Sequence, residues 1–173
     1  TATLFGLTVG IIGICERYGL KDKAVDFIKK LSKLTTGGLL SVWLVIRTLS
    51  AAFSLRLGGH VQFIRPIILP MAEGAAYVKF GEIDEKGEDE IKGAAAATEN
   101  YGNFYGQNCF MGASGTLLIV STLVAQGYEV DALQIAMASW PIAIVSMVVG
   151  IVMNFFVDRR LVARYAKKSP AAK

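Results

Sequence analysis

The side chains best suited to chemistry lie in residues 58–73, which read GGHVQFIRPIILPMAE between two apolar regions. This stretch holds His60, the only histidine of the chain, together with Gln62, Arg65 and Glu73. Histidine titrates near neutral pH, and arginine donates paired hydrogen bonds to anions. Polar residues at membrane depth normally line a cavity, so this stretch is the first candidate for a functional site.

Two prolines shape the same stretch. Pro66 and Pro70 each remove an amide donor, and each clashes with the carbonyl four residues back. With the two glycines that precede them, they predict a broken helix that enters the membrane and returns. We therefore expect residues 38–72 to form one span, from 38 to 57, and a short re-entrant segment, from 60 to 72.

A second arginine stands inside an apolar segment. Arg47 lies near the middle of residues 38–57, too far from either end to reach the membrane interface easily. A charge at this depth is rare and normally faces the bundle interior or a wet cavity with a partner. Two interpretations stay open: a functional arginine, or one bonded to backbone carbonyls at the end of a broken helix.

Amide side chains recur after residue 99 at helical spacing, so in a helix they form one polar seam. The predicted seam runs through Asn100, Asn103, Gln107, Ser114 and Ser121. We call its amides, Asn100, Asn103 and Gln107, together with the adjacent Asn108, the amide seam. Gly102 and Gly106, a pair of small residues in the same segment, allow a second helix to approach closely. The seam favours either a ligand site or hydrogen bonds that hold membrane helices together.

The distribution of charge predicts the fold class. Of the 173 residues, 53% are hydrophobic and 18% are charged, and no Asp, Glu, Lys or Arg lies between Glu99 and Glu129 or between Asp131 and Asp158. A membrane span needs about 20 mostly apolar residues, and both gaps are long enough. The chain is therefore predicted to be an all-α, polytopic integral membrane protein, in preference to a soluble protein with two buried helices.

Basic residues orient the predicted spans. The net charge is +4, and lysines and arginines cluster beside apolar segments, which marks the cytoplasmic side and argues against nucleic-acid binding. The resulting single membrane domain (1–173) ends with a cytoplasmic C-terminus. Its predicted segments are a partial span (1–15), a basic amphipathic interfacial helix (17–36), the span and re-entrant segment (38–72), an acidic cytoplasmic loop with a helical part (73–99), two further spans (100–127 and 132–157) and a basic cytoplasmic tail (158–173).

The motifs give no support to enzymatic chemistry. HExxH, GxSxG and Cys/His metal-ligand spacings are absent from the sequence, and Cys15 and Cys109 both lie in apolar segments. We therefore expect no enzyme, no metal site, no disulfide and no cofactor.

Three blocks of the sequence resemble a known family. The strings LTVGIIGICERYGLKDKA, LGGHVQFIRPIILPMAEGAA and AAAATENYGNFYGQNCF are similar to a bacterial integral-membrane family. That family was once catalogued as a domain of unknown function and is now described as one subunit of a two-subunit 5-oxoproline transporter. The resemblance implies a fold akin to the ion-transporter superfamily, the bacterial inner membrane as location and a partner membrane subunit from a sister family. It also implies further spans upstream of residue 1.

The resemblance gives the candidate residues their roles. 5-Oxoproline carries one carboxylate and one lactam, so a site for it needs cationic donors and amide partners. Arg65 or Arg47 would bind the carboxylate, while Gln62 and the amide seam would bind the lactam. His60 is also a candidate substrate ligand. Either Na⁺ at freed carbonyls or a proton on His60 or Glu73 would couple transport to an ion gradient.

Competing interpretations stay open for these residues and for the whole chain. His60 also fits a histidine bonded to the backbone, and Glu73 also fits a solvated residue at the start of a loop. The chain as a whole also fits a non-transporting structural subunit that stabilises a partner transporter.

Overall fold

A computed structural model describes residues 34–55 and 57–165 of the chain, and every regular element in that part is a helix. The helices are α3 (Thr36–Ala52), η1 (His60–Ile68), α4 (Leu69–Phe80), α5 (Glu85–Gln107), α6 (Ser114–Ala125) and α7 (Ala132–Tyr165). The all-α prediction is therefore confirmed for the described residues. The predicted segment 1–15, nearly all of 17–36 and the end of the tail lie outside them.

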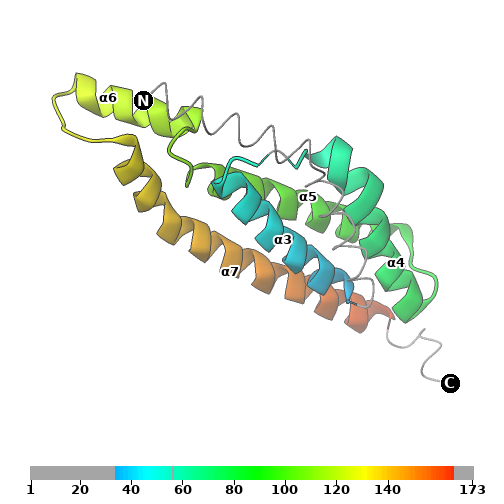
Figure 1. Ribbon diagram of the computed structural model, residues 1–173. Helices are drawn as coiled ribbons and strands as arrows, with labels where there is room; N and C mark the ends of the chain where they lie inside the picture. Colours follow the sequence, from blue (N-terminus) through cyan, green and yellow to red (C-terminus); the bar gives the residue numbers. More distant parts are fainter. Residues whose placement is uncertain (1–33, 56, 166–173) are drawn as a thin grey trace.

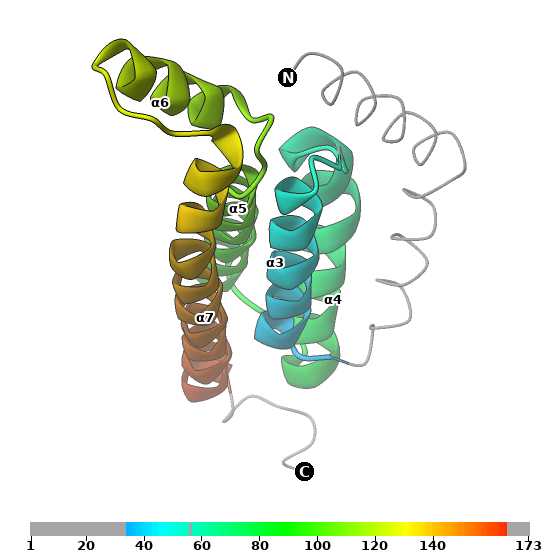
Figure 2. The same cartoon turned by 60° about the vertical axis from the view of Figure 1, so that its left-hand side comes forward.

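The longer helices run side by side in alternating directions (Figures 1 and 2). In Figure 2, α3 and α5 rise from the lower end, whereas α4 and α7 descend to it. Helix α3 packs against both α5 and α7, so it occupies the middle of the bundle. The short helix α6 lies beyond the end of α5 and contacts α7.

The helices α3 and α5 begin at residues that satisfy free backbone amides. Thr35 accepts a hydrogen bond from the Gly38 amide, and Asp84 accepts one from the Gly87 amide. Both are favoured N-cap residue types, because their oxygens replace the missing carbonyl partners of a first turn. Glu85 and Glu88 add negative charge at the start of α5, where the helix dipole stabilises it.

The helix that carries the two prolines is continuous, so the predicted break at the prolines is not found. Residues 60–68 form a π-helix that continues into α4, giving helix from His60 to Phe80. The Leu69 amide donates to the Ile64 carbonyl, five residues back. This wider spacing relieves the clash that Pro66 would make with a carbonyl four residues back in an α-helix. Pro70 lies in the first turn of α4, where proline is tolerated.

The predicted span 100–127 is divided into two helices. Helix α5 ends at Gln107, the chain turns through residues 108–113, and α6 begins at Ser114. The Asn108 side chain donates to the Phe104 carbonyl at 2.9 Å, which satisfies an acceptor left free at the end of α5. The acidic segment predicted for 73–99 is mostly helical, because only residues 81–84 separate α4 from α5.

The pair of small residues on α5 permits the close approach that the sequence predicted. A Cβ atom added to Gly102 would lie 2.9 Å from the Arg47 side chain, and one added to Gly106 would lie 2.4 Å from the Thr48 carbonyl oxygen. Neither distance is compatible with a larger residue unless the helices shift. The two glycines therefore set the distance between α3 and α5.

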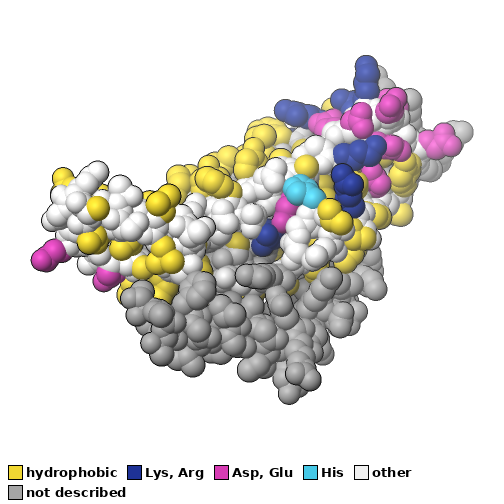
Figure 3. Space-filling view, turned by 90° about the horizontal axis from the view of Figure 1, so that it is seen from above, with side chains coloured by type: hydrophobic (Ala, Val, Ile, Leu, Met, Phe, Trp, Pro, Cys, Tyr) yellow, Lys and Arg dark blue, Asp and Glu magenta, His cyan; other side chains and the backbone are white. Residues whose placement is uncertain are grey.

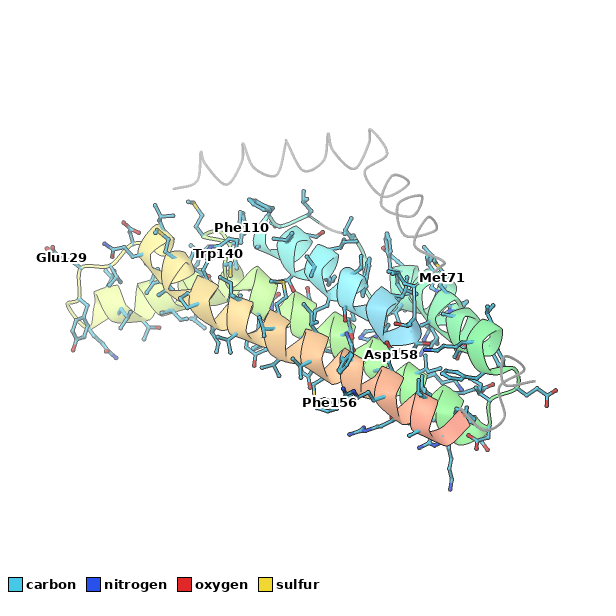
Figure 4. All side chains as sticks on the ribbon, turned by 90° about the horizontal axis from the view of Figure 1, so that it is seen from below. Met71, Phe110, Glu129, Trp140, Phe156 and Asp158 are labelled. Carbon is cyan, nitrogen blue, oxygen red and sulfur yellow. The ribbon has the colours of Figure 1, made fainter. Side chains whose placement is uncertain are left out.

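Helix α7 is the one helix in the described residues that is long and apolar enough to cross a membrane. It has 34 residues, and only 17% of its most apolar window is buried. Phe156 and Asp158 lie on opposite sides of it (Figure 4). Asp158 turns inward and accepts a hydrogen bond from the Gly37 amide at 2.8 Å, whereas Phe156 is 46% exposed. The predicted tail from residue 158 is thus helical as far as Tyr165.

Candidate functional site

A buried ion pair joins α3 to α5 in the middle of the bundle. Arg47 Nε donates to Glu99 Oε1 at 2.6 Å, and Arg47 Nη2 donates to Asn103 Oδ1 at 2.6 Å. Trp43 Nε1 donates to the second oxygen of Glu99 at 3.1 Å. Arg47 is 8% exposed and Glu99 is 3% exposed. Arg47 therefore has a carboxylate partner, and within the described residues its side chain has no hydrogen bond to a backbone carbonyl.

Helical spacing explains how the four side chains meet. Trp43 and Arg47 stand four residues apart on α3, and Glu99 and Asn103 stand four residues apart on α5. Residues at this spacing lie on one face of a helix. Gly102, between the two α5 residues, lets that face come against Arg47. The contact thus forms because each helix presents its two polar residues on one face and because Gly102 has no side chain to keep the faces apart.

A second polar contact lies beside the ion pair. His60 Nε2 and Asn100 Oδ1 are 3.1 Å apart, which joins the start of η1 to α5. Gly59 is also close, since a Cβ at that position would lie 3.8 Å from Glu99 Oε1. We call these residues the central polar cluster: Trp43, Arg47, His60, Glu99, Asn100 and Asn103.

The central polar cluster extends from the bundle interior to the surface. His60 is half-buried and Asn100 is exposed, whereas Glu99 is buried. Figure 3 shows the cyan histidine beside a magenta and a dark-blue side chain in the middle of the molecule, away from the end where most charges gather. The cluster therefore has a surface end, at His60 and Asn100, and a buried end at the ion pair.

The electrostatics of the ion pair restrict what it can do. An arginine and a carboxylate at hydrogen-bond distance neutralise each other, and each has lost much of its hydration. The surroundings are apolar, since Trp43 stacks on Phe63 with ring centroids 5.2 Å apart. Removing either charge leaves the other buried without a partner. Arg47 is thus able to bind another anion through Nε only if Glu99 is displaced.

Four of the predicted substrate ligands lie outside the central polar cluster. The Gln62 side chain lies over Gly58, where an added Cβ would be 2.3 Å from Gln62 Oε1. Asn108 caps the end of α5. Arg65 and Gln107 are exposed, and the structure gives neither side chain a hydrogen bond to another described residue. The amide seam is therefore split between the cluster, which takes Asn100 and Asn103, and the end of α5.

Glu73, the predicted coupling residue, lies on α4 and is half-buried. Its side chain makes no hydrogen bond to another described residue. The nearby end of the bundle, which we call the charged end, holds Tyr77, Glu88, Asp89 and Lys92. There, Glu88 accepts hydrogen bonds from Tyr77 at 2.5 Å and from Lys92 at 3.3 Å. Both bonds lower the pKa of Glu88 below its usual range, and the bond from Tyr77 contributes most.

The sequence analysis missed Glu99 and Trp43. Glu99 was assigned to the acidic segment 73–99, although it is the last acidic residue before the long charge-free stretch. It also stands four residues before Asn103, just as Trp43 stands four residues before Arg47. This matched spacing indicates that each pair lies on one face of its helix, but it does not show that the two helices pack against each other.

The described residues therefore form an all-α bundle with one long apolar helix and a buried polar cluster. The chain belongs to the family described as protein of unknown function (DUF969), which matches residues 1–162. No curated protein and no solved structure gave a significant match. Among the described residues, no group of three or more His, Cys, Asp or Glu side chains is placed to hold a metal ion.

Proposed function

We propose that the chain is a subunit of a secondary transporter that moves a small carboxylate across the bacterial cytoplasmic membrane. The observation that carries this proposal is the buried Arg47–Glu99 pair in the interior of the bundle. Ionisable residues at membrane depth are costly, and they commonly mark substrate or ion pathways. We propose that a small anion reaches Arg47 from the side of His60, which contacts Asn100 at the surface end of the cluster.

A membrane location is supported by the outer surface of α7. Large apolar side chains that are about half exposed cover this helix: Leu133, Met137, Ile142, Ile144, Val145, Val148, Val149, Met153, Phe155 and Phe156. An apolar surface of this kind is expected to face lipid or another membrane protein. We propose that lipid covers part of it and that a second membrane subunit covers the rest.

The orientation is supported by the positions of the charges. The start of α3, the 81–84 loop and the end of α7 lie at the same end of the bundle (Figure 2), and Arg159, Arg160 and Arg164 belong to that end. Excess arginine and lysine mark the cytoplasmic side. We therefore propose that α3 and α5 run outward, that η1 with α4 and α7 run inward, and that the C-terminus is cytoplasmic.

The proposed substrate is 5-oxoproline. Its carboxylate matches the guanidinium of Arg47, and its lactam matches the amides of Asn100 and Asn103. The sequence resemblance to 5-oxoproline transporter subunits supports this choice over other small carboxylates. Arg65 is an alternative cation for the carboxylate, since it is exposed on η1 one turn beyond His60.

A structural role is the second candidate function, and one observation favours it. Both oxygens of Glu99 and two nitrogens of Arg47 are already bonded within the chain. A polar cluster satisfied in this way holds two helices together without any ligand. In this alternative, the chain stabilises a partner that holds the substrate site.

Uptake into proteoliposomes separates the two functions. The co-purified two-subunit complex is tested with labelled 5-oxoproline and other carboxylates, with and without Na⁺ or proton gradients. The double variant Arg47→Met/Glu99→Met removes both charges together, which buried pairs often tolerate. Loss of uptake with an intact complex supports a substrate site here, whereas unchanged uptake supports the structural role.

Two further variants locate the cation that binds the substrate. Arg65→Ala tests the alternative ligand, and loss of uptake in this variant would move the site from Arg47 to η1. Lys92→Gln is the matched control, because it removes two exposed ion pairs outside the cluster. It is expected to leave uptake unchanged.

A further inference from the structure

We infer that Glu99 is the proton-carrying residue of this transporter and that one proton enters with each carboxylate. The inference rests on the proposed function and assigns the coupling step to a residue outside the predicted site. It follows from the way Arg47 is bonded. Glu99 holds Arg47 Nε at 2.6 Å and is itself 3% exposed.

The substrate and Glu99 compete for the same donors. A substrate carboxylate that binds Arg47 side-on, through Nε and Nη2, replaces Glu99 at Nε, because that hydrogen already points to Glu99 Oε1. A displaced, ionised Glu99 would remain buried with only Trp43 as a donor. A buried carboxylate without a charged partner takes up a proton instead. Substrate binding and protonation of Glu99 are thus one coupled exchange.

The exchange balances in atoms and charge. Before it, the site holds the Arg47 guanidinium and the Glu99 carboxylate, with a net charge of zero. The substrate anion and one proton then enter, the proton forms an O–H bond on Glu99, and the Arg47 hydrogen bonds pass to the substrate. The site again has a net charge of zero. Transport is therefore electroneutral, with one proton for each monovalent carboxylate.

The groups that face Glu99 come from α3 and η1. Helix α3 contributes Trp43 and Arg47, and η1 brings His60 close through Asn100. Within the described residues, α4 and α7 give Glu99 no hydrogen bond or ion pair. His60 is the only other titratable side chain at the cluster, and it is half-buried at the surface end. It lies where a proton from solvent would enter.

The variant Glu99→Gln tests the inference, because glutamine keeps an acceptor for Arg47 but does not titrate. In wild-type proteoliposomes, one pH unit across the membrane is expected to drive about tenfold accumulation of 5-oxoproline, with no response to a membrane potential set by K⁺ and valinomycin. Glu99→Gln is expected to keep exchange of labelled for unlabelled substrate and to show no accumulation. Accumulation by Glu99→Gln at the wild-type level would overturn the inference.

A second measurement applies if Glu99→Gln does not assemble. Binding of 5-oxoproline to the wild-type complex in weakly buffered detergent solution is expected to take up one proton per site, seen with a pH indicator dye. Binding without proton uptake would refute the role of Glu99 and leave the proposed function standing. Failure of the wild-type complex to transport any carboxylate would instead refute the proposed function.

Discussion

The molecule contains ion pairs in two contrasting settings. In the middle of the bundle, Arg47 and Glu99 meet at 2.6 Å, with side chains that are 10% and 4% exposed. At the charged end, Lys92 lies 3.3 Å from Glu88 and 3.4 Å from Asp89, and its side chain is 45% exposed. The same kinds of residue are thus held tightly in one region and loosely in the other.

The two settings differ in how much the loss of one charge is expected to cost. Exposed pairs are screened by water and salt, so they contribute little and tolerate substitution. A buried pair is costly to form and costlier to break, because each partner alone would be an uncompensated charge. We therefore expect substitutions in the central polar cluster to have large effects and those at the charged end to have small ones.

The largest effect is expected for Arg47→Ala. It leaves Glu99 buried without a cationic partner, and breaking a buried pair in this way costs about 3–5 kcal/mol. Thermal unfolding of the purified complex measures the loss. The double variant Arg47→Met/Glu99→Met should recover most of it. Equal destabilisation by the single and double variants would show that the two charges do not compensate each other.

The next effect is expected for Gly106→Ala. The new methyl group would lie 2.4 Å from the Thr48 carbonyl oxygen, so α3 and α5 must separate. Overpacking of this kind typically costs about 1–3 kcal/mol. Gly93→Ala is the matched control on the same helix, because nothing lies within 4 Å of its added Cβ. The control should stabilise α5 by about 1 kcal/mol, since alanine is the better helix former.

The smallest effect is expected at the charged end, for Tyr77→Phe. It removes the hydrogen bond to Glu88 that contributes most to lowering the Glu88 pKa. Because the folded-state pKa lies below its usual value of 4.5, the bond stabilises the fold above pH 4.5. That contribution is lost as the pH falls through the folded-state pKa. Unfolding midpoints of the two proteins should therefore differ slightly at pH 7 and converge in acid.

The sequence predicted those features that depend on one segment at a time. Helical spacing and charge-free gaps predicted the all-α fold, and the Gly102–Gly106 pair predicted the close approach of α5 to another helix. The prediction that a charge inside an apolar helix has a partner was also correct for Arg47. Each of these predictions rests on spacing within a single helix or on the cost of burying a charge.

The features that the sequence did not predict depend on local geometry or on pairing between helices. Pro66 normally breaks an α-helix, but the π-helical spacing of η1 accommodates it. The break after Gln107 involves no proline. Glu99 became a candidate only when α5 was placed against α3, since 52 residues separate it from Arg47. Helix spacing alone does not identify partners so distant in sequence.

Direct binding of labelled 5-oxoproline to the purified two-subunit complex tests the central claim, that the Arg47–Glu99 pair holds the substrate. The wild-type complex and the Arg47→Met/Glu99→Met variant are compared after their unfolding midpoints have been shown to match. The claim predicts saturable binding to the wild type and none to the variant. Equal binding by both complexes would contradict it and would place the carboxylate site elsewhere.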